Sequence, residues 1–215
     1  MRTMIAALLL ALLSLPTLAK ERPMETRLLE AARRGDAQAI GELLAQGAPV
    51  DARNGEGQTA LLVATHANQV TAAEALIAAG ADVNARDNIQ DSPYLYAGAR
   101  GLNQILRLTL AHGADLNSTN RYGGTALIPA AERGHVETVQ MLIDAGVQVN
   151  HLNRLHWTAL LEAVILGDGG PRHVEIVRRL LAAGADRAIA DKDGVTALEH
   201  ARQRGYGEMV EVLER

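Results

Sequence analysis

The sequence predicts an all-α solenoid in which short helix-turn-helix units stack side by side. A hydroxyl residue followed by a mostly apolar stretch recurs every 33 residues, at Thr59, Ser92, Thr125 and Thr158. A glycine recurs at the same interval at Gly47, Gly80, Gly113 and Gly146, and then after 38 residues at Gly184. Two markers with one period of this length indicate stacked structural repeats.

The segment 121–150 illustrates one unit. Gly123 and Gly124 predict a turn, and Thr125 is expected to cap a first helix because its hydroxyl can accept a hydrogen bond from a free first-turn amide. Gly134 is expected to end that helix. A second helix is then predicted to begin near Val136 and to stop at Gly146, with one apolar stripe formed by Val139, Leu142 and Ile143.

Six such units account for residues 25–215. The expected boundaries are 25–53 for a shortened first unit, then 54–86, 87–119, 120–152 and 153–190, and finally 191–215 for a unit that ends on its second helix. The fifth unit is longer because residues 168–172 are inserted in it. The two short end units are rich in charged residues, as terminal repeats must be when one of their faces meets water.

Several motifs of these units are similar to those of the ankyrin repeat. Gly-Ala-Asp-Val-Asn occurs at 80–84, Gly-Ala-Asp-Leu-Asn at 113–117, Gly-His-Val-Glu at 134–137, Gly-Ala-Asp at 184–186 and Ser-Pro at 92–93. The resemblance covers residues 25–215 and implies an all-α fold that binds other proteins and catalyses no reaction. The segments 120–130 and 157–170 resemble exported bacterial ankyrin proteins more specifically. His156 stands where the generic repeat has glycine, so an unusual backbone is expected at that turn.

The first residues have the pattern of a cleaved signal peptide. Arg2 is followed by an apolar run over 5–15 and by the small-residue pattern Thr-Leu-Ala at 17–19. We therefore expect residues 1–19 to be removed, residues 20–24 to form a tether, and the mature protein to be periplasmic. A membrane anchor is the alternative, but Ser14 and Pro16 interrupt the run before it reaches the ~20 residues that a span needs.

Composition excludes several classes of function. The chain has no cysteine, which excludes disulfides, thiolate metal sites and cysteine nucleophiles. Its net charge of −4 offers no positive field for phosphates, so nucleic acid is not an expected partner. No cofactor is expected, and no combination of nucleophile, base and orienting group indicates an enzyme.

The histidines, a calcium-like segment and a glycine-rich insertion each have a structural interpretation. His135 and His173 follow first helices, and His112 precedes the glycine that ends a second helix, so we expect them to bond nearby backbone. Asp191, Asp193 and Gly194 resemble the start of a calcium loop but match the turn of the repeat. No metal site is therefore predicted.

The aromatic residues predict a partner-binding surface on units three to five. Tyr122 and Trp157 are expected at adjacent turn tips, and charged residues cluster near them on the concave face. Tyr94 is expected in the core, whereas for Tyr96 the sequence favours neither the core nor the surface. The predicted partner-binding residues are Arg100, Arg121, Tyr122, Glu132, Arg133, Arg154, Trp157 and Asp168.

The function expected from these observations is that of a monomeric, non-catalytic scaffold. It would bind another exported protein, such as an enzyme that it stabilises or protects. The insertion 168–172 could be either a contact site or a tolerated linker. The alternative function is a small-ligand or metal-binding protein that uses residues 167–173.

Overall fold

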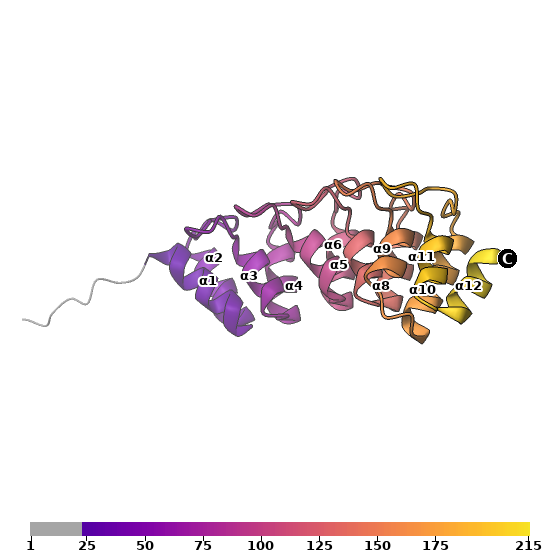
Figure 1. Cartoon of the computed structure of the whole chain (residues 1–215). Helices are drawn as coiled ribbons and strands as arrows, with labels where there is room; N and C mark the ends of the chain where they lie inside the picture. Colours follow the sequence, from indigo (N-terminus) through magenta and orange to yellow (C-terminus); the bar gives the residue numbers. More distant parts are fainter. Residues whose placement is uncertain (1–22) are drawn as a thin grey trace, which may run out of the picture.

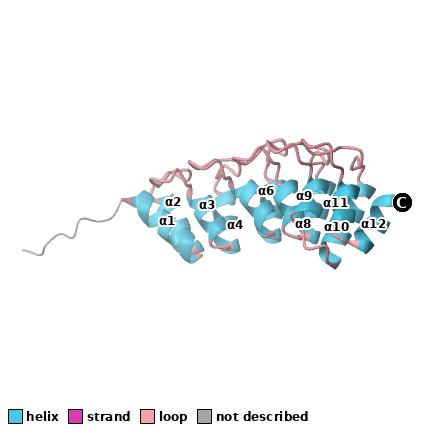
Figure 2. Cartoon of the chain, in the orientation of Figure 1, coloured by secondary structure: helices cyan, strands magenta, loops and turns pink. Residues whose placement is uncertain are grey.

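The structure is a computed structural model that describes residues 23–215, and in this part of the chain twelve helices form two parallel rows (Figure 1). The expected signal peptide at 1–19 and the tether residues 20–22 lie outside the described residues. Loops run along one side of both rows (Figure 2), and apart from two isolated bridges this part of the chain contains no extended pairing. The predicted all-α solenoid of six helix-turn-helix units is confirmed.

Each unit contributes one helix to each row. The row of first helices consists of α1 (Met24–Arg34), α3 (Ala60–His66), α5 (Pro93–Arg100), α7 (Leu127–Glu132), α9 (Ala159–Ile165) and α11 (Ala197–Gln203). The row of second helices consists of α2 (Ala37–Ala45), α4 (Val70–Ala78), α6 (Asn103–Ala111), α8 (Val136–Asp144), α10 (Pro171–Ala182) and α12 (Gly207–Glu214). Helices contact their partner in the unit and their neighbour in the row, so the contacts are local, as in other solenoids.

One continuous apolar core runs between the rows from the first unit to the last. The first helices of units two to five are largely buried, and residues such as Leu61, Leu127 and Leu161 are fully enclosed. Each such leucine contributes about 1.5–3 kcal/mol to stability by leaving water. Tyr94 is also fully enclosed, which confirms its expected place in the core, and burial raises the pKa of its hydroxyl well above the ordinary value.

Hydroxyl caps begin four of the first helices, three of them at the recurring hydroxyl positions of the sequence and the fourth at Thr196. Thr59, Ser92, Thr158 and Thr196 each accept a hydrogen bond from the amide three residues later. These hydroxyls hold the start of each first helix in the same place relative to its turn.

The predicted cap at Thr125 is wrong. Its buried hydroxyl has no hydrogen-bond partner among the described residues, and α7 starts two residues later. The reason is Pro129, which has no N–H to donate to the Thr125 carbonyl. The Ile128 amide donates to this carbonyl instead, at 3.2 Å, and no longer reaches the hydroxyl.

The structure adjusts two expected boundaries. Helix α1 begins at Met24, within the range assigned to the tether, because Pro23 takes the position just before the helix. The insertion 168–172 is only partly a loop, since Pro171 and Arg172 form the first turn of α10. Proline suits that position because a first-turn amide has no partner within the helix.

Candidate functional site: a groove beside the turn tips

The turn tips of units two to six share one hydrogen-bonding pattern. An Asn or Asp opens each tip, and its side chain accepts hydrogen bonds from the amides two and four residues later. In unit four, Asn120 Oδ1 accepts from the amides of Tyr122 at 2.9 Å and Gly124 at 3.1 Å. The equivalent opening residues are Asn54, Asp87, Asn153 and Asp191.

This pattern points the third residue of every tip outward. In units three to five that residue is apolar and exposed: Ile89 is 51% exposed, Tyr122 59% and Leu155 51%. These three residues recur at the period of 33 and form a line along the tips, which we call the apolar ladder. Tyr122 was predicted from the sequence, whereas Ile89 and Leu155 were missed, although their spacing from Tyr122 could have revealed them.

Trp157 does not lie at an exposed tip, which corrects the prediction. It is the fifth residue of its tip, and its half-buried side chain packs against the core. Its amide donates to Asn153 Oδ1 at 3.0 Å, a bond that closes the turn and directs the side chain inward.

A groove of about 570 Å³ lies beside the ladder, between the tips and the first helices of units three to five. We call it the central groove. It brings together five of the eight predicted residues, namely Arg100, Arg121, Tyr122, Glu132 and Arg133. Apolar walls come from Ile128, Leu155 and Leu166, the last of which is 51% exposed. An adjoining hollow of about 410 Å³ shares Arg100 and Arg133 and continues toward unit two.

The three arginines of the groove are engaged by aromatic rings or by backbone. Arg121 lies 4.8 Å from the ring centroid of Tyr122, and Arg100 lies 5.7 Å from that of Tyr96. Arg133 Nη1 donates to the Ala99 carbonyl at 2.7 Å. All three are exposed, so they form the rim of the groove.

A buried carboxyl group, Glu162 of α9, forms part of the floor. Its side chain is only 6% exposed, and Oε1 accepts a hydrogen bond from Asn153 Nδ2 at 2.7 Å. Burial, followed by the negative charge of Glu132, raises the pKa of Glu162 to about 7. Burial and the nearby Asp87 also raise the pKa of Asp91, which lines the same groove.

Sequence reasoning missed Glu162, although its spacing from Glu132 carries a signal. The two residues stand 30 positions apart, as do His66 and Tyr96, whose ring centroids are 4.1 Å apart. This offset joins the end of one first helix to the middle of the next.

Arg154 and Asp168 stabilise local structure outside the groove. The Arg154 guanidinium donates to the Arg121 carbonyl at 2.7 Å, and its amide donates to the Tyr122 carbonyl at 3.0 Å, so it ties the tips of units four and five together. Asp168 Oδ1 lies 2.7 Å from His173 Nδ1 and accepts a bond from the Gly170 amide at 2.9 Å. Both hydrogen bonds lower the pKa of Asp168.

The insertion is packed against the last unit. The ring of Tyr206 lies against Gly169, where a Cβ would come within 2.4 Å of it, and its hydroxyl donates to the Gly167 carbonyl at 3.1 Å. His173 Nε2 lies 2.9 Å from the Glu132 carbonyl oxygen, and His112 Nδ1 lies 2.8 Å from that of Leu108. The expected backbone-bonding role of these two histidines is confirmed.

The calcium-like segment at 191–194 is a turn tip of the repeat. Asp191 Oδ1 accepts bonds from the amides of Asp193 and Val195, and Oδ2 lies 2.7 Å from His200 Nε2. Both carboxylate oxygens therefore have partners from the protein. Within residues 23–215, no group of three or more His, Asp or Glu residues is arranged to hold a metal ion.

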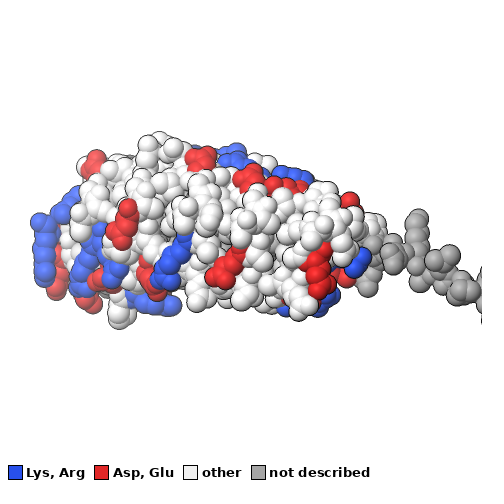
Figure 3. All heavy atoms as spheres, turned by 180° about the vertical axis from the view of Figure 1, so that it is seen from behind, with Lys and Arg blue, Asp and Glu red and all other residues white. Residues whose placement is uncertain are grey.

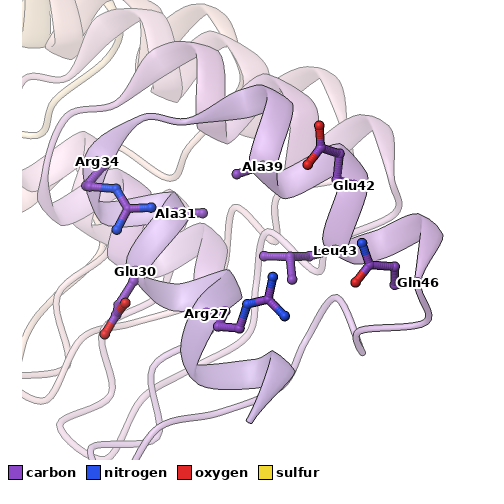
Figure 4. A pocket seen from close by; sticks show the side chains of 8 residues that line it. All are labelled: Arg27, Glu30, Ala31, Arg34, Ala39, Glu42, Leu43 and Gln46. Carbon is purple, nitrogen blue, oxygen red and sulfur yellow. The ribbon is translucent and has the colours of Figure 1, made fainter. Parts of the chain in front are cut away.

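A separate hollow of about 420 Å³ opens on the first unit, between α1 and α2 (Figure 4). The side chains around it include Arg27, Arg34 and Glu42, with only Ala31, Ala39 and Leu43 as apolar lining. This surface is the polar face of the terminal unit. On the face shown in Figure 3, acidic and basic side chains lie close to each other over both ends of the array.

A scan against family models matches the description "Ankyrin repeats (3 copies)" over residues 4–87 and 94–186. The chain belongs to the ankyrin-repeat family. Ankyrin-repeat proteins generally act as protein-interaction scaffolds and are typically not enzymes. In the described part of this ankyrin-repeat protein, no helix is both long and apolar enough to cross a bilayer.

Solved ankyrin structures resemble this protein over most of its length. An ankyrin repeat domain from Acinetobacter baumannii AYE is 64% identical, with a TM-score of 0.85, and the match covers 87% of this chain and 95% of that one. The ankyrin repeat protein EF0377 is 44% identical, also with a TM-score of 0.85, over 89% of this chain and 98% of the other. The ankyrin repeat protein YahD of Escherichia coli K12 is 46% identical over 52 residues, which are 24% of this chain and 26% of YahD.

Proposed function

We propose that this ankyrin-repeat protein binds another protein through the apolar ladder and the central groove of units three to five. The observation that carries the proposal is the ladder itself, three large apolar side chains exposed in three consecutive units beside a groove. Exposed apolar and aromatic residues next to arginines are the usual composition of binding hot spots. Tips held by repeated hydrogen bonds lose little conformational freedom when a partner docks.

The proposed setting is the periplasm, and the proposed consequence of binding is stabilisation or protection of an exported enzyme. The pattern at 1–19 supports export. Fractionation of cells that produce the full chain, with mass measurement of its N-terminus, tests this point. Recovery of the uncleaved chain from the cytoplasm would contradict it.

Site-specific photocrosslinking in cells tests the binding surface. A photoreactive amino acid is placed at Tyr122 or Leu155 on the ladder, and at Glu74, which is exposed on the second helix α4, as the matched control. The expected result is a crosslinked protein of the same mass from both ladder positions and none from the control. Equal crosslinking at Glu74, or crosslinking there alone, would move the binding surface elsewhere.

The small-ligand alternative at 167–173 receives no support from the geometry. The ring of Tyr206 occupies the space beside Gly169, and Asp168 and His173 bond to each other.

A further inference from the structure

Two carboxyl groups, those of Glu132 and Glu162, line the floor of the central groove. Glu132 and Glu162 occupy the pair of positions at which His66 and Tyr96 stack in earlier units. Burial, and then the negative charge of Glu132, disfavours ionisation of Glu162. Glu162 therefore retains a proton up to about neutral pH, since its pKa is raised to about 7.

Among residues 23–215 the Arg133 charge only partly offsets the effects that raise the pKa of Glu162, and it forms no ion pair with the floor. Within residues 23–215, neither Glu132 nor Glu162 forms an ion pair, although Arg133 lies nearby. The Arg133 guanidinium is instead bonded to the Ala99 carbonyl. The carboxyl groups thus lie deeper than the exposed arginines of the rim, and a side chain that reaches the floor meets negative charge.

The walls above this floor are apolar. Tyr122, Leu155 and Leu166 are each at least half exposed, and all three line the groove. A side chain with an aliphatic stem and a cationic head matches apolar walls above an acidic floor, because the stem contacts the walls while the head reaches the carboxylates.

We infer that the groove binds a partner segment that carries one arginine or lysine flanked by apolar residues. The basic head lies against Glu132 and Glu162, and the apolar neighbours lie on the ladder. This inference rests on the proposed protein-binding function and names the chemistry of the partner. Because the cation replaces the proton held by Glu162, binding releases up to one proton and strengthens as pH rises.

A pair of short peptides tests the inference. Each has two leucines around one variable residue, which is arginine in one peptide and citrulline, the neutral analogue of the same shape, in the other. Titrations of the isotope-labelled mature protein, followed by amide chemical shifts, are expected to give a roughly millimolar Kd for the arginine peptide and one about tenfold weaker for citrulline. Shifts should map to the tips and first helices of units four and five.

The pH dependence provides a second readout. The affinity for the arginine peptide is expected to rise by up to about tenfold from pH ~6 to pH ~8, which is the change in the ionised fraction of a group with a pKa near 7. Equal affinities for the two peptides, or an affinity that is flat or falls with pH, would overturn the inference.

Variants assign the effect to the floor. Glu162→Gln keeps an oxygen that can accept from Asn153 and removes the charge, so the preference for arginine and the pH dependence should both disappear. Glu137→Gln on α8, whose carboxylate pairs with Arg107 on the second-helix row, is the matched control and should change neither. If the Glu162→Gln protein still prefers the arginine peptide, Glu162 does not contribute to the binding site.

The experiments distinguish a failure of the proposed binding surface from a failure of the inferred basic partner segment. If a protein crosslinks at Tyr122 and Leu155 but the peptides do not distinguish arginine from citrulline, the binding surface stands and the basic segment is wrong. If the arginine peptide binds but no protein crosslinks at the ladder, the groove recognises the chemistry and the proposed function fails.

Discussion

The turn tips fall into two groups even though their backbones are built alike. In units two to six an Asn or Asp closes each tip with the same pair of hydrogen bonds. The outward residue is apolar in units three to five, at Ile89, Tyr122 and Leu155, and acidic in units two and six, at Glu56 and Asp193. Because acidic residues fill this position in the outer units, folding does not require an apolar one, and this difference supports the proposed role of the ladder in binding.

Two tips of the ladder also differ from the outer tips in the residue type at one backbone position that all the tips share. The residue after the outward one has a positive φ in every tip, and it is glycine in units two, four and six. In units three and five it is Gln90, with φ 69°, and His156, with φ 68°. The unusual backbone predicted at His156 is confirmed. Side chains in this region of φ are strained, so two of the three ladder tips hold strain that the outer tips avoid.

Making the ladder resemble the outer tips is expected to have the largest effect. The triple change Ile89→Glu, Tyr122→Glu and Leu155→Glu should weaken binding of the crosslinked partner roughly a hundredfold or more, because it removes the apolar contacts at the centre of the surface. The unfolding midpoint should change little, since all three side chains are at least half exposed. The measurements are a Kd by biolayer interferometry and a thermal melt. The double change Glu56→Ala and Asp193→Ala is the control, and an equal loss of binding there would contradict the role of the ladder.

The floor beneath the ladder is expected to give the next largest effect. The pKa of Glu162 is raised in the folded state, so the folded protein retains a proton that the unfolded chain has lost between pH ~4.5 and ~7. Stability should therefore fall as pH rises through this window and stay level above it. Glu162→Gln should remove this slope and be more stable than the parent by ~2–3 kcal/mol at pH ~8. Urea unfolding at several pH values measures this, and parallel curves for the two proteins would contradict it.

Relieving the backbone strain in unit five is expected to have a smaller effect. His156→Gly should stabilise the fold by about 1 kcal/mol, because glycine adopts a positive φ without a steric penalty. Gly194→Ala at the equivalent position of unit six should destabilise it by a similar amount. Thermal melts report both, and a His156→Gly protein that melts at a lower temperature would show that the histidine makes a compensating contact.

The smallest expected effect is a pH response of the opposite sign in unit six. Hydrogen bonds from the Val195 amide and from His200 lower the pKa of Asp191, so their stabilisation is present above its ordinary value of 3.8 and is lost as pH falls below it. Hydrogen exchange of the Val195 amide should speed up in acid relative to that of the Trp157 amide, after correction for intrinsic rates. Asp191→Asn is the control that should abolish this difference.

The repeat period alone predicted most of the fold but not all of the site. Spacing placed the hydroxyl caps, the helix ends and the line of charged residues in units three to five. It placed the cap at Thr125 incorrectly. Pro129 has no amide to donate to the Thr125 carbonyl, and the Ile128 amide takes this bond instead of bonding the Thr125 hydroxyl. Spacing also placed Trp157 at the surface. Which residues of a tip point outward and which point inward depends on the hydrogen bonds that close the tip, and these are not visible in the spacing.

The sequence by itself determined that the chain is a stack of six ankyrin units with atypical residues in the third to fifth, since a period and its exceptions can be read from residue spacing. Only the tertiary structure decided which of these residues face one another. Glu132 and Glu162 lie 30 positions apart, and the charge of Glu132 raises the pKa of the buried Glu162 only because α7 packs against α9. Charge and burial depend on neighbours in space, and the stacking of helices selects those neighbours.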